Sequence, residues 1–386
     1  MSKKRKFYLW RDALICSLTS VFVAILLLTF FINIKFLDPF EKAIEDFRFT
    51  DIYTSQNFIE KKPTHKIIIV NIGNHDREDI AIAINKIAQN KAKVIGLDII
   101  FKDKKDSIMD AVLQQALQNN KNIVSAYIIE ENKIISSDPY FRTDALGFIN
   151  LNQQDAVVRD FTGIKKSENQ IDYAFPIKIS EMAGLLNENT KEKLERVQSI
   201  NYTANQNSFL TFDLDEIIYA DTIPAIENSI VLFGYLGVPT GNVNDIEDKH
   251  FTPLNPKYAG KSIPDMFGIL IHANIIKMLM EDNFMYKVPK AMVYCIAFLC
   301  CFMCIYFSLI MHKKKSTLYD FILKFYGLAL TIVLVYFSFV LFKWNVDIQI
   351  ETVIILSLLG LEIVALYEHS LNYLKKRWKW KSYLLK

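Results

Sequence analysis

The sequence predicts an α/β domain with a mainly parallel sheet, joined to an α-helical membrane region of four transmembrane helices. In the middle of the chain, short β-branched runs alternate with amphipathic helical patterns, which is the order of parallel strands linked by crossover helices. Nearer the two ends lie four apolar windows, each close to the ~20 residues that a spanning helix needs. With 12 Gly and 10 Pro in 386 residues, the composition excludes collagen-like and linker-rich chains.

The first apolar window, residues 13–35, predicts a signal anchor. No charged residue interrupts it until Lys35. A cleavable signal peptide has a shorter apolar run and a small-residue cleavage site after it, and no such site follows here. We therefore expect this segment to stay in the membrane.

The strands and helices of the first half of the domain follow one another regularly. Residues 66–72 form a continuous β-branched run, which is typical of a strand that is covered on both faces. A helix beginning near Asp76 follows, then a strand at 93–101, a helix at 106–118 and a strand at 122–129. This order predicts a parallel sheet with right-handed crossovers.

The second half is less regular. A long apolar helix over about 264–281 ends it and is expected to run almost directly into the second span. Before that helix we expect short strands at 147–151 and 156–163 that could form a hairpin, a helix at 174–186, a strand at 198–202, a helix at 212–219 and a strand at 229–236.

The placement of Lys and Arg predicts the orientation in the membrane. Basic residues gather before the first window, between the second and third, and after the fourth. These segments share one side only if the chain crosses four times, so both termini are expected in the cytoplasm and the main domain outside. The predicted division is a basic cytoplasmic segment (1–12), spans at 13–35, 290–311, 322–342 and 348–368, an extracytoplasmic domain (36–289), a cytoplasmic loop (312–321), an external turn (343–347) and a basic cytoplasmic tail (369–386).

The five cysteines all lie in predicted spans, so the external domain is not a disulfide scaffold. Cys301 and Cys304 have the spacing of a redox motif, but inside an apolar helix we interpret them as small apolar residues.

A set of short motifs occurs in a characteristic order along the domain. They are Asp46-Phe-Arg48, the strand at 67–72, the segment 92–101, Gly147–Asn150, Asp155–Arg159, Ile200–Tyr202, Ser229–Gly234, Thr252-Pro253 and Gly268–Asn274. Together they resemble the CHASE2 domain, a bacterial extracytoplasmic sensory domain. One anchor before the domain and three spans after it also resemble the usual arrangement of that family.

The resemblance implies a non-enzymatic sensor or assembly subunit in the bacterial cytoplasmic membrane. In the family a cyclase, kinase or similar output domain typically follows the last span, whereas here only a short basic segment follows. We therefore expect the external domain to bind a small ligand or an envelope partner. The spans are expected to relay this binding event to a separate membrane protein.

His272 and Asn274 lie on the helix that is apolar almost all round. Buried polar groups need hydrogen-bond partners, so the pattern favours a role in tying this helix to loops at the sheet edge. The alternative is that they line a ligand cleft, with Asp245, at the carboxyl ends of the strands. Asp46 and Arg48 suit a structural ion pair, and Arg159, which the resemblance singles out, is ligand-binding or structural.

No motif predicts a metal, a cofactor or a catalytic residue. His65, His75, Asp76, Asp245, Asp248 and His250 lack a tight metal-ligand spacing. No phosphate-loop, nucleophile-elbow or kinase signature occurs. We expect no cofactor and no enzyme activity, with an envelope enzyme acting near His272 as the alternative.

Glu362 and Lys324 are charged residues that lie within predicted spans, inside their ends. A charge at the centre of a span costs about 2.5–3.5 kcal/mol on insertion scales, so these side chains either pair with each other or separately reach the interface. The basic, Trp-containing tail suits anionic lipid headgroups. A net charge of +3 and an acidic external domain argue against nucleic acid as a partner.

Overall fold

The computed structural model describes residues 3–32, 48–56, 64–131, 133–152, 157–166, 170–238, 247–256, 263–313 and 318–385. The chain forms two compact units. The first, Met1–Thr50 with Tyr286–Lys386, is the helical unit, and the second, Asp51–Met285, is the sheet domain. The first contains the predicted spans, and the second contains the predicted α/β pattern.

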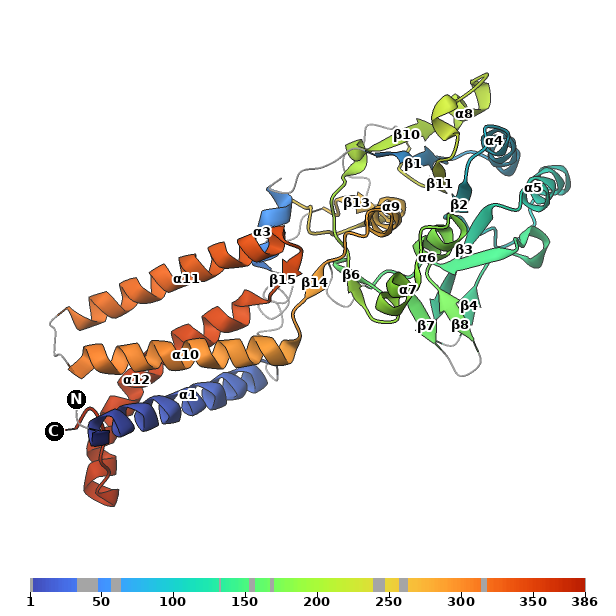
Figure 1. Ribbon diagram of the computed structural model, residues 1–386. Helices are drawn as coiled ribbons and strands as arrows, with labels where there is room; N and C mark the ends of the chain where they lie inside the picture. The colour runs from blue at the N-terminus through green and yellow to red at the C-terminus, as the bar shows by residue number, and fades with distance from the viewer. Residues whose placement is uncertain are drawn as a thin grey trace. The chain divides into compact units, whose positions relative to one another are not determined.

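A mainly parallel sheet forms the centre of the sheet domain, as predicted (Figure 1). Six strands pair in parallel in the order β10-β1-β11-β2-β3-β5, and β4 adds to β3 in the antiparallel direction. The strands are β1 (Thr64–Asn71), β2 (Val94–Leu97), β3 (Ile123–Glu130), β4 (Lys133–Ile135), β5 (Ala145–Phe148), β10 (Phe209–Asp213) and β11 (Ile230–Gly234).

Helices cover both faces of this sheet (Figure 1). On one face, α4 (Arg77–Gln89), α5 (Ser107–Asn119) and α8 (Leu214–Tyr219) pack on strand residues such as Ile68 and Val70. On the other, α6 (Phe175–Met182) and α9 (Gly268–Met280) pack on Ile67 and Ile69. Because neighbouring residues of β1 point to opposite faces, its apolar run is buried on both sides.

Smaller elements complete the domain. They are α3 (Phe49–Ser55), α7 (Glu188–Leu194), the 3-10 turns η2 (Pro139–Phe141), η3 (Gln206–Ser208) and η4 (Pro224–Ile226), and the short pairs β6 (Asp160–Phe161) with β9 (Gln198–Ser199), β7 (Ile164–Lys166) with β8 (Ile171–Tyr173), and β12 (Lys249–His250) with β13 (Met266–Phe267).

The second half of the domain differs from the prediction in its strands. The strand predicted at 147–151 is β5, which pairs with β3 in the main sheet instead of forming a hairpin with the next segment. Residues 209–213 form the edge strand β10, where the predicted helix at 212–219 overlapped it. The helix begins at Leu214, because Asp213 and Glu216 form a capping box around its first turn.

The long helix predicted over 264–281 is also shorter. Met266 and Phe267 pair with β12, and α9 runs only from Gly268 to Met280. Asp282 then adopts a left-handed backbone with φ of 45°, which ends the helix. The chain reaches the next helix through β14 (Tyr286–Lys287), so α9 is not continuous with the second span.

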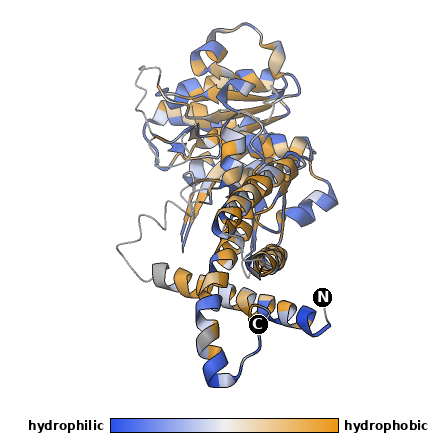
Figure 2. Ribbon diagram, turned by 90° about the vertical axis from the view of Figure 1, so that its left-hand side faces the viewer, coloured by the Kyte–Doolittle hydropathy of each residue, from blue (hydrophilic) through white to orange (hydrophobic). Residues whose placement is uncertain are grey.

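Among the residues that the structure describes, the helical unit contains four helices that are long and apolar enough to cross a membrane, as predicted. In Figure 2 they are mainly orange, and the ends nearest the two termini are blue. They are α1 (Lys3–Ile32), α10 (Lys290–Lys313), α11 (Tyr319–Lys343) and α12 (Ile350–Trp378). α1 already begins within the predicted basic segment, and α12 continues well past residue 368.

Small side chains and a short strand pair bring these helices together. A Cβ at Gly360 of α12 would lie 2.6 Å from Sγ of Cys301 on α10, so the two helices approach closely at this glycine. All five cysteines are free, Cys301 and Cys304 included. β14 pairs in parallel with β15 (Val346–Asp347), which links the start of α10 to the turn between α11 and α12.

The last residues fold back onto α1. The buried carboxylate of Asp12 accepts hydrogen bonds from Oγ of Ser382 and the backbone N–H of Tyr383, both at 2.7 Å. The Arg11 guanidinium lies 4.2 Å from the centre of the Trp380 ring. The last residues of the tail are therefore packed on protein, whereas its cations Lys375, Lys376, Arg377, Lys379 and Lys381 are exposed.

Candidate ligand-binding site

Two cavities open at the carboxyl edge of the sheet, and both include Ile100. The α9 cavity has a volume of about 450 Å³ and is lined by Asp98, Ile100, Ile128, Ile149, Asn150, Leu151, Tyr235, Asp248, His250, Gly268 and His272. The α4–α5 cavity has a volume of about 510 Å³ and is lined by the segments that follow β1 and β2. In open α/β sheets this edge is where ligands bind.

Asp98 is the first residue after β2 and lies in the wall of the α9 cavity. Its backbone N–H donates to the carbonyl of Phe233 at 2.9 Å, which fixes the residue beside the end of β11. Its side chain is only partly exposed, and it receives no hydrogen bond within the described part of the chain. Burial, and then the nearby Asp248 carboxylate, raise the pKa of Asp98 to about 7.

Asp248 and His250 reach the same cavity from the β12–β13 pair. A Cβ built on Gly268 would lie 3.5 Å from both carboxylate oxygens of Asp248 and 3.7 Å from Nε2 of His250. Both groups therefore converge on one point at the start of α9. Asp248 is exposed as a residue, but partial desolvation of its carboxyl in the cavity raises its pKa to about 6. Burial lowers the pKa of His250.

His272 lies one turn into α9 and is 3% exposed. The edge of its ring contacts Phe175 of α6, with centroids 5.5 Å apart. Its Nδ1 is buried and has no hydrogen-bond partner. Burial, and then the neighbouring His250, lower the pKa of His272 to about 3, so the imidazole is neutral at physiological pH.

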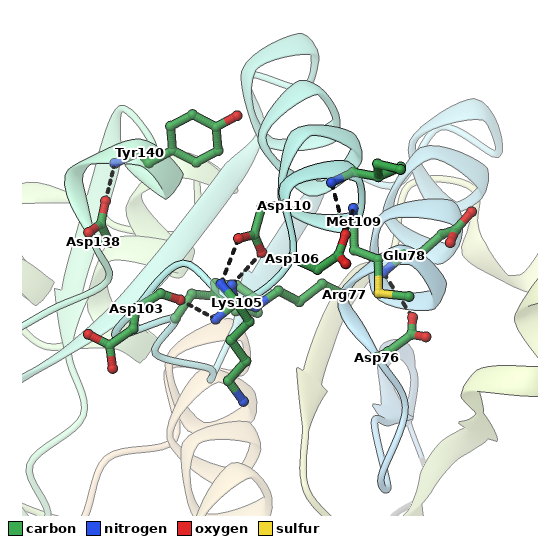
Figure 3. A network of polar contacts seen from close by, with 12 residues as sticks. Asp76, Arg77, Glu78, Asp103, Lys105, Asp106, Met109, Asp110, Asp138 and Tyr140 are labelled. Atoms are coloured by element: carbon green, nitrogen blue, oxygen red, sulfur yellow. Dashed lines mark hydrogen bonds and ion pairs between the residues drawn. The ribbon is translucent and has the colours of Figure 1, made fainter.

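The polar groups of the α4–α5 cavity are engaged with one another (Figure 3). Arg77 donates to the carboxylate of Asp110 and, at 2.5 Å, to the carbonyl of Asp103. Asp76 and Asp106 cap α4 and α5 by accepting from backbone N–H groups of the first turn. No buried side-chain N or O atom of the described residues that line this cavity lacks a hydrogen bond, so this cavity is the weaker candidate for a ligand.

The predicted candidates on α9 have different surroundings. His272 lines the cavity, whereas Asn274 does not. The fully buried Asn274 amide accepts from the N–H of Ala204 at 3.1 Å and donates to its carbonyl at 3.0 Å. Asn274 thus joins α9 to the segment before β10, the kind of tie that the sequence favoured for both residues.

The other predicted polar residues lie away from the cavity or outside the described residues. Arg159 forms a two-point ion pair with Asp51 of α3, at 3.2 and 2.5 Å, and both side chains are almost fully buried. Nη1 of Arg48 lies 3.9 Å from Oδ2 of Asp347 in the helical unit. Asp46 and Asp245 fall outside the residues that the structure describes.

Glu362 and Lys324 are both exposed on the helical unit and form no ion pair with each other. Of the two readings of these charges, pairing therefore has no support in this structure.

No group of three or more His, Cys, Asp or Glu residues is arranged to hold a metal ion in the described part of the chain. Sequence reasoning missed Asp98, although a signal was present. An aspartate directly after a buried apolar strand of a parallel sheet stands at the edge where ligands bind.

The described residues thus form an α/β domain with a sheet-end cavity and four helices that are long and apolar enough to cross a membrane. A family model described as the CHASE2 domain matches residues 20–309, more than half of the chain, and the protein therefore belongs to the CHASE2 family. CHASE2 is an extracytoplasmic sensory domain. No curated protein and no solved structure matches the chain.

Proposed function

We propose that this protein is a membrane sensor whose external domain binds a small ligand in the α9 cavity. The observation that carries the proposal is that the buried Nδ1 of His272 has no hydrogen-bond partner and lines the same cavity as the partly exposed carboxyl of Asp98. A buried polar atom without a hydrogen bond costs about 1–3 kcal/mol, which a ligand with a matching group would offset. The cavity volume lies within the range of small-molecule sites.

A cavity-filling variant tests this proposal. Gly268→Leu places an apolar side chain where Asp248 and His250 converge, and the matched control Ser107→Leu makes the same kind of change at the exposed start of α5. The full-length proteins, in lipid nanodiscs, are unfolded by heat with a panel of amines, amino acids, sugars and carboxylates. Compounds that stabilise the wild type are expected to stabilise Ser107→Leu but not Gly268→Leu. Equal stabilisation of all three would rule out the α9 cavity.

An enzyme acting at His272 is the alternative, and the cavity chemistry supports it less. With its pKa near 3, His272 is a weak base at neutral pH. The described lining residues include no Ser, Thr, Cys or Lys nucleophile. Mass spectrometry of the stabilising compounds after incubation distinguishes the two functions, because a sensor leaves them unchanged.

We further propose that the main domain lies outside the cytoplasm, with both termini inside. Reporter fusions after residues 315 and 385 should then read cytoplasmic, and a fusion near residue 200 should read external. A cytoplasmic reading at 200 would overturn this topology.

The signal is proposed to pass to a membrane partner through α11 and α12. α11 has only 11% of its apolar window buried, against 56% for α12, so most of its surface is available to lipid or protein. Glu362 is exposed on α12, and a charge within a span favours a polar partner. Glu362→Gln should weaken co-purification of a membrane partner, whereas Glu368→Gln, at the end of the span, should not. Equal recovery of partners from wild type and Glu362→Gln would contradict the relay through this residue.

A further inference from the structure

We infer that the ligand of the α9 cavity is a small organic cation, an ammonium ion that carries an apolar body. This inference rests on the proposed function, and it names the class of ligand. It starts from Asp98 and Asp248, which enter the cavity from different elements, and from His272, which is almost fully buried beside them without a partner for Nδ1.

The charges around the cavity favour a cation. Asp98 follows β2 and Asp248 precedes β12, so two carboxylates reach the cavity from different elements. The two imidazoles carry no compensating charge at neutral pH, since burial lowers the pKa of both.

No Lys or Arg is among the described residues that line the cavity. The Lys249 ammonium, which is not part of the lining, lies 4.8 Å from the centre of the Phe267 ring. An ammonium ion would place a positive charge against Asp98 and Asp248.

Much of the remaining lining is apolar. Ile100, Ile128, Ile149 and Leu151 belong to it, and the Asn150 amide is occupied by both backbone groups of Ile129. A bare metal ion would leave these side chains unused, whereas an alkyl or aryl body would cover them. The ligand therefore has two ends, one charged and one apolar.

The change in protonation of Asp98 on binding gives a second way to recognise a cationic ligand. Because the pKa of Asp98 is about 7, part of this carboxyl is protonated at pH 6.5, and a bound cation would expel that proton. An anionic ligand would do the reverse, since it favours the protonated carboxyl. Binding of a cation should also weaken below pH 6, where Asp98 and Asp248 are both largely protonated.

Three probes with one carbon skeleton test the inference, namely 3-methylbutylammonium, 3-methylbutanol and 3-methylbutanoate. Isothermal titration calorimetry of the full chain in nanodiscs at pH 7.5 should give an affinity at least tenfold higher for the ammonium than for the alcohol, and no binding of the carboxylate. Asp98→Asn should lower the ammonium affinity at least tenfold. The control Asp144→Asn, at the amino end of β5 on the opposite edge of the sheet, should leave it unchanged. Titrations in buffers of different ionisation enthalpy should show proton release at pH 6.5 that disappears at pH 8.5.

The outcomes separate the two proposals. Ammonium binding that Asp98→Asn does not alter, absence of ammonium binding, or equal affinities for the ammonium and the alcohol would overturn the cation inference. Binding of the carboxylate, or tighter binding of the alcohol than of the ammonium, that Gly268→Leu abolishes would also overturn it, while the sensor site itself would stand.

Discussion

Asp98 is partly buried, and its carboxyl lacks a hydrogen bond within the described part of the chain. In its ionised form the residue therefore lowers the free energy of unfolding. Its raised pKa means that the folded protein binds more protons at this residue than the unfolded chain does between about pH 4 and pH 7. The stability of the wild type should therefore fall as the pH rises through that window. Perturbed pKa values are common at functional sites, so a residue of this kind at the sheet edge is a candidate binding group.

Asp98→Asn removes this cost. We expect the variant to be more stable than the wild type by about 1–3 kcal/mol at pH 8, less than the full shift implies because solvent screens a partly exposed group. The gain should shrink towards zero as the pH falls to 4, close to the unfolded-state pKa of 3.8, because both states of the wild type then bind nearly the same number of protons at this residue. Thermal unfolding of both proteins at pH 4, 6 and 8 measures it, and a gain that does not depend on pH would contradict the assignment.

The site could be predicted only in part. His272 could be identified from the sequence because a polar residue on an all-apolar helix must be buried. The sequence did not predict that Asp248 and His250 belong to the site. Their position depends on the β12–β13 pair, whose strands have two residues each and are too short to show a hydrophobic periodicity. Asp98 fell inside the strand predicted at 93–101, whereas β2 ends at Leu97, so its place at the sheet edge depends on where the strand ends in the tertiary structure.

At the scale of elements, the regular first half of the sheet domain was predictable, and the second half was not. β1, β2 and β3 are buried apolar runs flanked by capped amphipathic helices, so local pattern and tertiary structure agree. β10 lies at the sheet edge with side chains that are mostly half-buried, and its pairing with β1 comes from the tertiary fold.

Gly147 shows how closely the elements pack. A Cβ at this position would lie 2.5 Å from Cα and 2.8 Å from N of Phe175, which are backbone atoms at the start of α6. Gly147→Ala should therefore destabilise the protein by roughly 2–4 kcal/mol, because β5 and α6 would have to separate.

A matched glycine provides the control. Gly184 has nothing within 4 Å of its would-be Cβ but a φ of +66°, so Gly184→Ala should cost only about 1 kcal/mol. Denaturant unfolding of the two variants in nanodiscs measures both values. Equal destabilisation would show that close approach is not the reason for glycine at 147.

At the scale of the whole molecule, the chain passes twice between its two units, within α3 and again between α9 and β14. Each passage has anchors on both sides of the boundary. In α3, the Phe49 N–H donates to Glu351 of the helical unit at 2.9 Å, while Asp51 pairs with Arg159 of the sheet domain. The ligand cavity includes the start of α9, so the same helix that contributes to the site also leads to the second passage.

Hydrogen–deuterium exchange tests the central claim, a ligand site in the α9 cavity of a membrane sensor, most directly. The full-length protein in nanodiscs is compared with and without the compound that raises its unfolding temperature most. We predict slower amide exchange in residues 98–101, 247–252 and 266–272, which line or support the cavity, and no such change in Gly268→Leu. Slower exchange confined to residues 103–109 of the α4–α5 cavity, or no protection in the sheet domain, would contradict the account.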